Sequence, residues 1–80
     1  MKITLITGAT SGLGLELARI YAKENNNILL VARNENKLKD IQKELQDKYN
    51  NLVIDYFVAD LEQKEEIKKV YNYTLAKQYF

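Results

Sequence analysis

All three glycines of the chain lie in one short stretch, T-G-A-T-S-G-L-G, which runs from Thr7 to Gly14. Glycines between a strand and a helix permit a tight turn, bring backbone amides close to a pyrophosphate, and let the helix pack closely against the strand. The amino terminus of the helix then offers free N–H groups and a partial positive charge to the phosphates. The stretch therefore predicts a phosphate-binding loop. Its candidate residues are Gly8, Thr10, Ser11, Gly12, Leu13 and Gly14.

The loop fits other glycine-rich motifs less well. A glycine-rich turn without a ligand is the simplest alternative. A Walker A loop would end in Gly-Lys-Ser or Gly-Lys-Thr, whereas leucine follows both Gly12 and Gly14. The general dinucleotide spacing G-x-G-x-x-G is also absent. The strand and helix patterns on either side of the loop favour a bound dinucleotide over an empty turn.

Arg33 follows an apolar run, Ile28 to Ala32, at the place where dinucleotide-binding folds distinguish their cofactors. An acidic residue there would accept hydrogen bonds from the ribose hydroxyls of NAD. A guanidinium instead offers a fork of donors that matches phosphate oxygens. Arg33 therefore indicates NADP rather than NAD, with Ser11 as a second donor. The alternative is an ordinary solvated surface arginine.

Alternating strand and helix patterns surround these residues and predict an α/β fold. Apolar, β-branched runs at 3–7, 28–32 and 52–59 suit strands, and the second is apolar throughout, as in a strand covered on both faces. Helical spacing follows each run, with Asn25 to Asn27 ending the first helix and Asn34 capping the second. The order β-α-β-α-β-α predicts right-handed crossovers on a parallel three-stranded sheet of order 3-2-1. This is a Rossmann-like, partial doubly wound fold in one domain, residues 1–80.

The third helix is expected to begin at Asp60. Asp60 would cap it, and Gln63 three residues later completes a capping-box-like pattern. Its predicted buried stripe consists of Ile67, Val70, Tyr71, Thr74 and Leu75.

Composition narrows the possible functions. The absence of cysteine and histidine argues against a disulfide framework and the common metal sites, so no metal is expected. A net charge of +1 lacks the basic excess of proteins that bind nucleic acid. The amino terminus lacks a secretory signal pattern, and no apolar run approaches the roughly 20 residues that cross a bilayer. We therefore expect a cytoplasmic protein with neither nucleic acid nor membrane as a partner.

Three stretches together resemble the classical short-chain dehydrogenase/reductase family. Thr7, Gly8, Gly12 and Gly14 match its motif T-G-x-x-x-G-x-G, and L-V-A-R-N is similar to the end of its second strand. A-D-L at residues 59–61 resembles the motif that contacts the adenine ring, which implies cofactor contacts from Asp60 and Leu61. The resemblance covers essentially the whole chain. It implies an NADP-dependent oxidoreductase that transfers hydride to or from a carbonyl or alcohol.

In this family a Tyr, a Lys and a Ser carry the reaction, and the resemblance implies that they lie beyond position 80. Tyr73 and Lys77 do spell the family's Y-x-x-x-K, but they fall on the third helix, and Ser11 is the only serine. We interpret both as exposed residues that point away from the sheet. The catalytic residues are thus expected to be absent, and the chain to be a fragment, a truncated reading frame or one piece of a larger fold.

Two alternatives to an oxidoreductase remain open from the sequence. The chain or its parent could hold a dinucleotide without catalysing a reaction, or it could be a non-functional truncated product. The first strand, Ile3 to Thr7, would also form a bare apolar edge through which copies of the chain self-associate. The carbonyl or alcohol substrate cannot be identified from the sequence.

Overall fold

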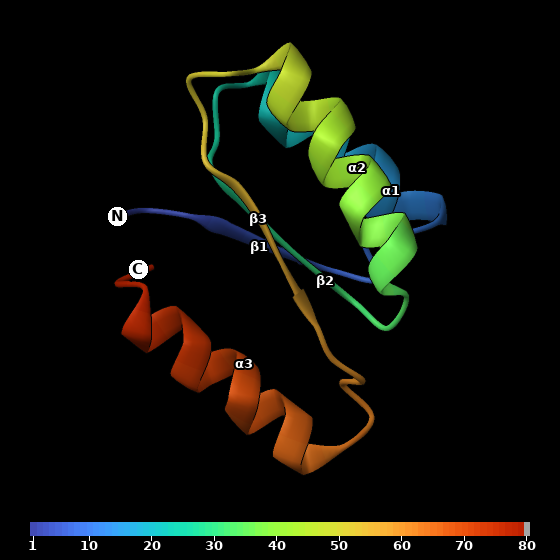
Figure 1. Cartoon of the computed structure of the whole chain (residues 1–80), viewed down its shortest axis with the longest axis vertical. Coiled ribbons are helices and arrows are strands. Elements are labelled where there is room, and N and C mark those ends of the chain that lie inside the picture. Colours follow the sequence, from blue (N-terminus) through green and yellow to red (C-terminus); the bar gives the residue numbers. More distant parts are fainter. Residues whose placement is uncertain (80) are drawn as a thin grey trace.

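The computed structural model describes residues 1–79 as three parallel strands that alternate with three helices. Figure 1 shows α1 and α2 together on one side of the strands and α3 on the other. The strand order is β1-β2-β3, which confirms the predicted α/β fold and its 3-2-1 order. The elements are β1 (Thr4–Thr7), α1 (Gly12–Lys23), β2 (Ile28–Ala32), α2 (Glu35–Lys48), β3 (Ile54–Val58) and α3 (Lys64–Ala76).

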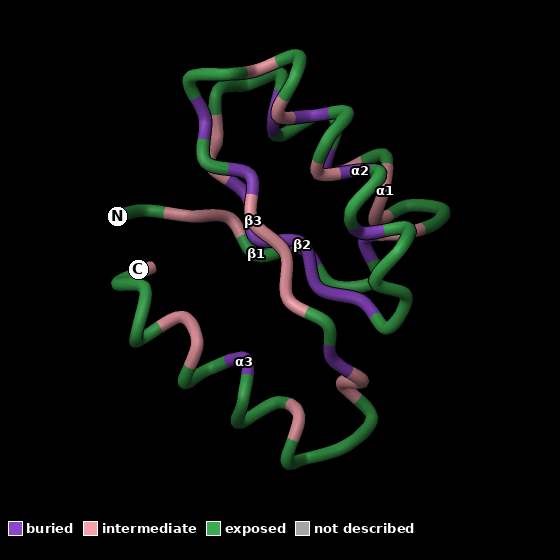
Figure 2. The backbone as a smooth tube through the Cα atoms, in the orientation of Figure 1, coloured by how far each residue is buried: buried purple, intermediate pink, exposed green. Residues whose placement is uncertain are grey.

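The central strand β2 carries the core. All five of its residues are buried, because β1 and β3 flank it and helices cover both faces of the sheet. Ile28, Leu30 and Ala32 point into a cluster under α1 and α2, while Leu29 and Val31 point into a smaller cluster under α3. In Figure 2 the buried residues accordingly concentrate on β2 and on the inner sides of α1 and α2. This alternation fixes the register of β2 in the sheet.

Two predicted helix boundaries are confirmed. Asn25 adopts a left-handed conformation, with φ of 70°, just after α1 ends. The Asn34 side chain accepts a hydrogen bond of 3.1 Å from the Lys37 N–H and so caps α2.

The predicted start of α3 is wrong. The helix begins at Lys64 with Gln63 at its cap position, rather than at Asp60. The Asp60 carboxylate instead accepts a 3.0 Å hydrogen bond from the N–H of Glu62, two residues on. Aspartate forms such local turns in competition with a helix cap, so the chain makes a further turn before α3.

The predicted buried stripe of α3 is also only partly right. Val70 is buried and Thr74 is partly buried, but Ile67, Tyr71 and Leu75 are about half exposed or more. Within residues 1–79 the sheet ends at β1, so no strand lies beneath that side of the helix. Tyr73, in contrast, was predicted to be exposed. It is partly buried and packs against Phe57 of β3, with 4.7 Å between the ring centroids.

Candidate functional site

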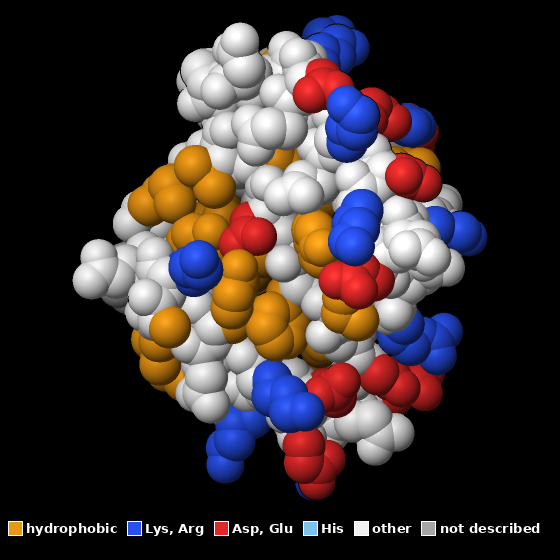
Figure 3. Space-filling model, in the orientation of Figure 1, with side chains coloured by type: hydrophobic (Ala, Val, Ile, Leu, Met, Phe, Trp, Pro, Cys, Tyr) orange, Lys and Arg blue, Asp and Glu red, His pale blue; other side chains and the backbone are white. Residues whose placement is uncertain are grey.

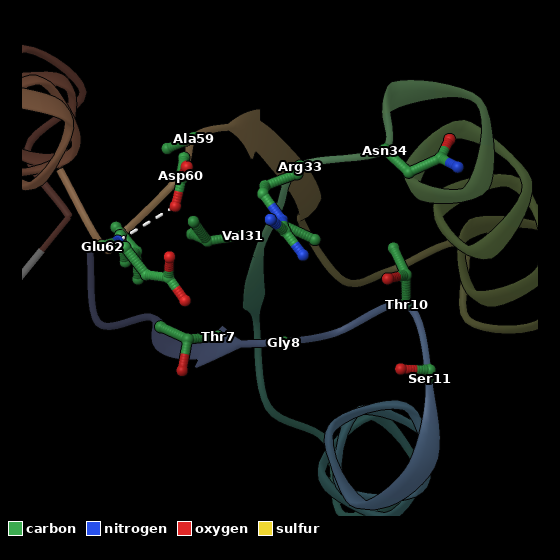
Figure 4. A pocket seen from close by; sticks show the side chains of 12 residues that line it. Thr7, Gly8, Thr10, Ser11, Val31, Arg33, Asn34, Ala59, Asp60 and Glu62 are labelled. Atoms are coloured by element: carbon green, nitrogen blue, oxygen red, sulfur yellow. Dashed lines mark hydrogen bonds between the residues drawn. The ribbon is translucent and has the colours of Figure 1, made fainter.

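A cleft of about 480 Å³ opens at the carboxyl ends of the three strands. Figure 4 shows the Gly8–Ser11 segment on one side of it, the end of β3 on the other, and Arg33 between them. Ligands of open parallel sheets bind at this end of the strands. The lining residues are Thr7, Gly8, Thr10, Ser11, Val31, Ala32, Arg33, Asn34, Ala59, Asp60, Leu61 and Glu62.

The glycines of the loop meet two separate requirements. Gly8 and Gly12 have φ of 62° and 54°, a left-handed conformation that side chains rarely adopt. Gly14 has an ordinary conformation but no room for a side chain, since a Cβ there would stand 2.1 Å from the carbonyl oxygen of Gly8. The close approach brings the start of α1 directly against the loop that leaves β1.

The start of α1 is free to receive an anion. Its first intrahelical hydrogen bond runs from the Leu15 N–H to the Ser11 carbonyl, so the N–H groups of Gly12 to Gly14 have no partner within the helix. The hydroxyl of Ser11 makes no capping bond. The first turn of α1 contains no acidic side chain, whereas α2 and α3 each have glutamate there. The positive end of the α1 dipole is therefore not neutralised by its own side chains.

Arg33 places a cation beside this loop. It follows β2 directly, is exposed, and extends in Figure 4 into the space between Thr10 and Asp60. Among residues 1–79, no carboxylate lies within 4.0 Å of its guanidinium. Arg19, in contrast, is held by Glu16 and Glu44 at 3.0 Å each. Arg33 is thus the arginine whose donors are available to a ligand.

An ordered turn forms the opposite wall of the cleft. Asp60 accepts from the Glu62 N–H through Oδ1, and its own N–H donates to Glu66 Oε1 at 3.5 Å. Glu66 in turn lies 3.0 Å from the Lys69 ammonium, whose hydrogen bond is the main reason that the pKa of Glu66 is lowered. The anionic Glu66 is therefore a fixed acceptor for the turn, and Oδ2 of Asp60 has no hydrogen-bond partner within the described residues.

The structure brings most of the predicted binding residues together. Gly8, Thr10, Ser11, Arg33, Asp60 and Leu61 line the cleft, whereas Gly12, Leu13 and Gly14 do not. Leu13 is 74% exposed, so its side chain points to solvent. Only its backbone N–H belongs to the free groups at the start of α1. That these residues contact a cofactor stays a prediction.

Several lining residues were not predicted as part of the site. Thr7, Val31, Ala32, Asn34 and Ala59 lie at or just beyond strand ends, where the parallel-sheet rule could have found them. Glu62 lies in the turn before α3, and nothing in the sequence pattern indicated it.

Tyr73 and Lys77 are not arranged as an acid/base pair. The Tyr73 hydroxyl donates to Asp55 Oδ2 at 2.5 Å, and the Tyr79 hydroxyl donates to the same oxygen at 2.7 Å. Burial, and next the Asp55 carboxylate, raise the pKa of Tyr73 well above its usual value. The Lys77 ammonium lies over the Tyr73 ring, 5.6 Å from its centroid. A tyrosine base beside a lysine needs a lowered pKa. Tyr73 instead joins α3 to β3 through Asp55 and Phe57.

Neither Tyr73 nor Lys77 lines the cleft. The amino group of Met1 donates to the Gln78 carbonyl at 2.7 Å, which places the end of α3 beside the start of the chain. Figure 1 shows both termini at the same side of the molecule. The cleft lies at the opposite ends of the strands. The prediction that Tyr73 is exposed was wrong, because this residue is partly buried. The prediction that it takes no part in a catalytic site agrees with its position outside the cleft.

None of the helices formed by residues 1–79 has the length and apolar character needed to span a membrane. The expected cytoplasmic location stays a prediction.

Comparison with known proteins agrees with the fold. Residues 2–78 match the family model of the short chain dehydrogenases. An alignment of 76 positions, which covers 92% of this chain, shows 38% identity to an 11-beta-hydroxysteroid dehydrogenase of Pinus massoniana, of which the chain covers 20%. The chain spans about a fifth to a third of the length of the curated relatives it matches.

Two solved structures show the same arrangement of elements. An alcohol dehydrogenase of the archaeon Thermococcus sibiricus, complexed with 5-hydroxy-NADP, superimposes with a TM-score of 0.89 at 28% identity over 96% of this chain and 32% of that one. A short-chain dehydrogenase of Sphingobium yanoikuyae in complex with NADPH gives 0.79 at 30% identity, over 86% and 26%.

Proposed function

This chain belongs to the short-chain dehydrogenase family, and on that premise we propose that its cleft binds NADP for an oxidoreductase. The observation that carries the proposal is the free guanidinium of Arg33 beside the unneutralised start of α1. Two anionic groups, a pyrophosphate and a 2′-phosphate, would then meet two separate sources of positive charge. The similar structures from Thermococcus sibiricus and Sphingobium yanoikuyae contain 5-hydroxy-NADP and NADPH, which supports the same cofactor here.

Each wall of the cleft has its own part in this proposal. The backbone amides of the glycine loop and the first turn of α1 hold the pyrophosphate. Arg33 and the Ser11 hydroxyl bind the 2′-phosphate, because a fork of charged donors fits phosphate oxygens. Asp60 and Leu61 contact the adenine ring, where the carboxylate of Asp60 accepts from the exocyclic amino group. Residues 1–80 act as one dinucleotide-binding domain.

The bound nicotinamide supplies hydride transfer to a carbonyl or from an alcohol. The residues of this chain bind and orient the cofactor for that step. Tyr73 and Lys77 take no part, because Asp55 holds the tyrosine hydroxyl away from the cleft. The hydrogen bond between Tyr73 and Asp55 also favours one second candidate function, a module that holds the dinucleotide without catalysing a reaction.

Equilibrium binding tests the proposal directly. Titration of the chain with NADPH and with NADH, followed by the fluorescence of the reduced nicotinamide, gives the two dissociation constants at one ionic strength. We expect the dissociation constant for NADPH to be the lower by at least tenfold. Equal constants would contradict the NADP assignment, and no binding of either would contradict the proposed cofactor site itself.

A further inference from the structure

Asp60, in the wall of the cleft, is held by the chain around it at all but one of its polar atoms. Its carbonyl oxygen accepts from the Gln63 N–H at 3.1 Å, and its Oδ1 accepts from the Glu62 N–H at 3.0 Å. Its own N–H donates to Glu66 Oε1 at 3.5 Å. Within residues 1–79, Oδ2 is the polar atom of Asp60 without a hydrogen-bond partner. The turn thus leaves one acceptor of Asp60 for a ligand.

The contact with Glu66 differs in kind from the other two. Both of the other partners belong to the same turn as Asp60, whereas Glu66 lies in the first turn of α3. The helix itself is fixed on the sheet by the buried side chain of Val70 and by the hydrogen bond from Tyr73 to Asp55 of β3. Glu66 therefore joins the position of the turn, and with it the position of Asp60, to that of the helix.

Glu66 is in turn held at both of its carboxylate oxygens. Oε2 lies 3.0 Å from Nζ of Lys69, which follows three residues along α3, and this leaves Oε1 for the Asp60 N–H. The Glu66 side chain is 27% exposed, so it is mostly covered by the residues around it. The hydrogen bonds from Lys69 and from the Asp60 N–H lower the pKa of Glu66. Its carboxylate therefore stays charged and accepts at both oxygens.

Charge alone does not distinguish Glu66 from its neighbour Glu65. Figure 3 shows side chains of both charges together over the start of α3, and both glutamates belong to its first turn. Both carboxylates therefore lie near the positive end of the helix dipole. Glu65 is exposed, and among the described residues its side chain forms no ion pair or hydrogen bond. Only the carboxylate of Glu66 reaches back to Asp60.

We propose that Glu66 is a positioning residue that gives the cleft a preference for adenine over 6-oxopurines, because it fixes the turn from which Asp60 presents its free oxygen to the base. The inference rests on the proposed function, in which the cleft binds NADP and Asp60 accepts from the exocyclic amino group. That amino group is a donor, whereas the oxygen that replaces it in hypoxanthine is an acceptor and repels a carboxylate at the same place. The position of Oδ2 therefore determines how well the two bases are distinguished.

Hydrogen exchange of the Asp60 amide tests the contact without any cofactor. We expect this amide to be protected in the unaltered 80-residue chain and in Glu66→Gln, which keeps an accepting oxygen, and to lose its protection in Glu66→Ala. Glu65→Ala removes the same charge from the same helical turn and should leave the protection unchanged. A rapidly exchanging Asp60 amide in the unaltered chain, or equal protection in Glu66→Ala, would overturn the inference whether or not the chain binds NADPH. The first of these outcomes is decisive even if Glu66→Ala does not fold.

Calorimetric titration tests the consequence for the base, with NADPH and with the reduced dinucleotide in which hypoxanthine replaces adenine. We expect the unaltered chain, Glu65→Ala and Glu66→Gln to bind NADPH more tightly by about tenfold or more, the value of a charge-assisted hydrogen bond. Glu66→Ala should lose most of this preference. A general loss of folded chain weakens both dinucleotides alike, so it does not change the ratio of the two dissociation constants.

The outcomes separate this inference from the proposed function. An unchanged preference in Glu66→Ala, a preference lost equally in Glu66→Gln or in Glu65→Ala, or no preference in the unaltered chain would overturn the role of Glu66 and leave the NADP site standing. Binding of neither dinucleotide by the unaltered chain would overturn the proposed function, and the inference with it.

Discussion

Gly8 and Gly14 are in such close contact that a Cβ on Gly14 would stand 2.1 Å from the Gly8 oxygen and 2.7 Å from its carbonyl carbon. The contact joins the loop after β1 to the first turn of α1. The loop that would hold the pyrophosphate therefore owes its shape to helix packing as well as to its own conformation.

We expect Gly14→Ala to destabilise the fold by about 1–3 kcal/mol or more, because the clash is with backbone that cannot rotate away. Cofactor binding should weaken further, since relief of the clash moves the loop. Gly12→Ala is the control. Its Cβ would meet nothing within 4 Å, and only the strain of its positive φ remains, about 1–2 kcal/mol. Denaturant unfolding measures both, and equal, small losses would contradict the packing argument.

Asp55 provides a second prediction, which concerns pH. Burial, followed by the Asp55 carboxylate, raises the pKa of Tyr79 to about 12, and the pKa of Tyr73 is raised further. Both values in the folded chain lie above the ordinary 10.0, so the stabilisation is complete below about pH 10 and is lost as pH rises through the folded values. We expect the free energy of unfolding to fall steeply above about pH 10.

Phenylalanine substitutions test this assignment. The double variant Tyr73→Phe/Tyr79→Phe should be less stable at neutral pH, because it leaves Asp55 Oδ2 without its two donors. Its stability should also depend less on alkaline pH. Tyr71→Phe is the control, since Tyr71 is 61% exposed and should keep the original pH dependence. An unchanged alkaline slope in the double variant would show that other groups cause it.

The parts of this structure that follow from local patterns were predictable from sequence. The all-apolar run of β2 and the caps at Asn25 and Asn34 depend on neighbouring residues alone, and all were predicted correctly. The start of α3 was missed because Asp60 can either cap a helix or form a turn, and local sequence does not decide between them. Periodicity likewise could not reveal that, among residues 1–79, no strand lies beneath the side of α3 that carries Ile67 and Tyr71.

The residues of the candidate site also fall into two groups, those that local sequence predicts and those that only the folded chain brings together. Gly8 and Arg33 could be predicted as cleft residues because their residue types are restricted by backbone conformation and phosphate chemistry. Glu62 enters the cleft only through the turn at Asp60, which required the folded chain. The hydrogen bond between Tyr73 and Asp55 joins residues 18 apart in sequence, so the helical pattern alone gave the wrong exposure for Tyr73.

The hydrogen bond between Tyr73 and Asp55 also leads to a prediction about catalysis. We expect the 80-residue chain to reduce no carbonyl compound above the background rate with NADPH, because the Tyr73 hydroxyl is bound to Asp55 and its pKa is raised rather than lowered. Absorbance of NADPH at saturating cofactor measures the rate with a panel of ketones and aldehydes. Turnover that disappears in Tyr73→Phe would show that Tyr73 does serve as the acid.

Arg33 provides the sharpest test of the cofactor. A charge-assisted pair between its guanidinium and a 2′-phosphate is worth about 1.5–3 kcal/mol, or roughly 10- to 150-fold in affinity. Arg33→Ala should weaken NADPH binding by that factor and leave NADH binding nearly unchanged, since NADH lacks this phosphate. Lys39→Ala, which removes an exposed cation from α2 outside the cleft, should alter neither. Adding Ala32→Asp to Arg33→Ala should begin to favour NADH, because a carboxylate accepts from the ribose hydroxyls. If Arg33→Ala weakens both cofactors equally, Arg33 supports the pyrophosphate or the fold, and the NADP assignment fails.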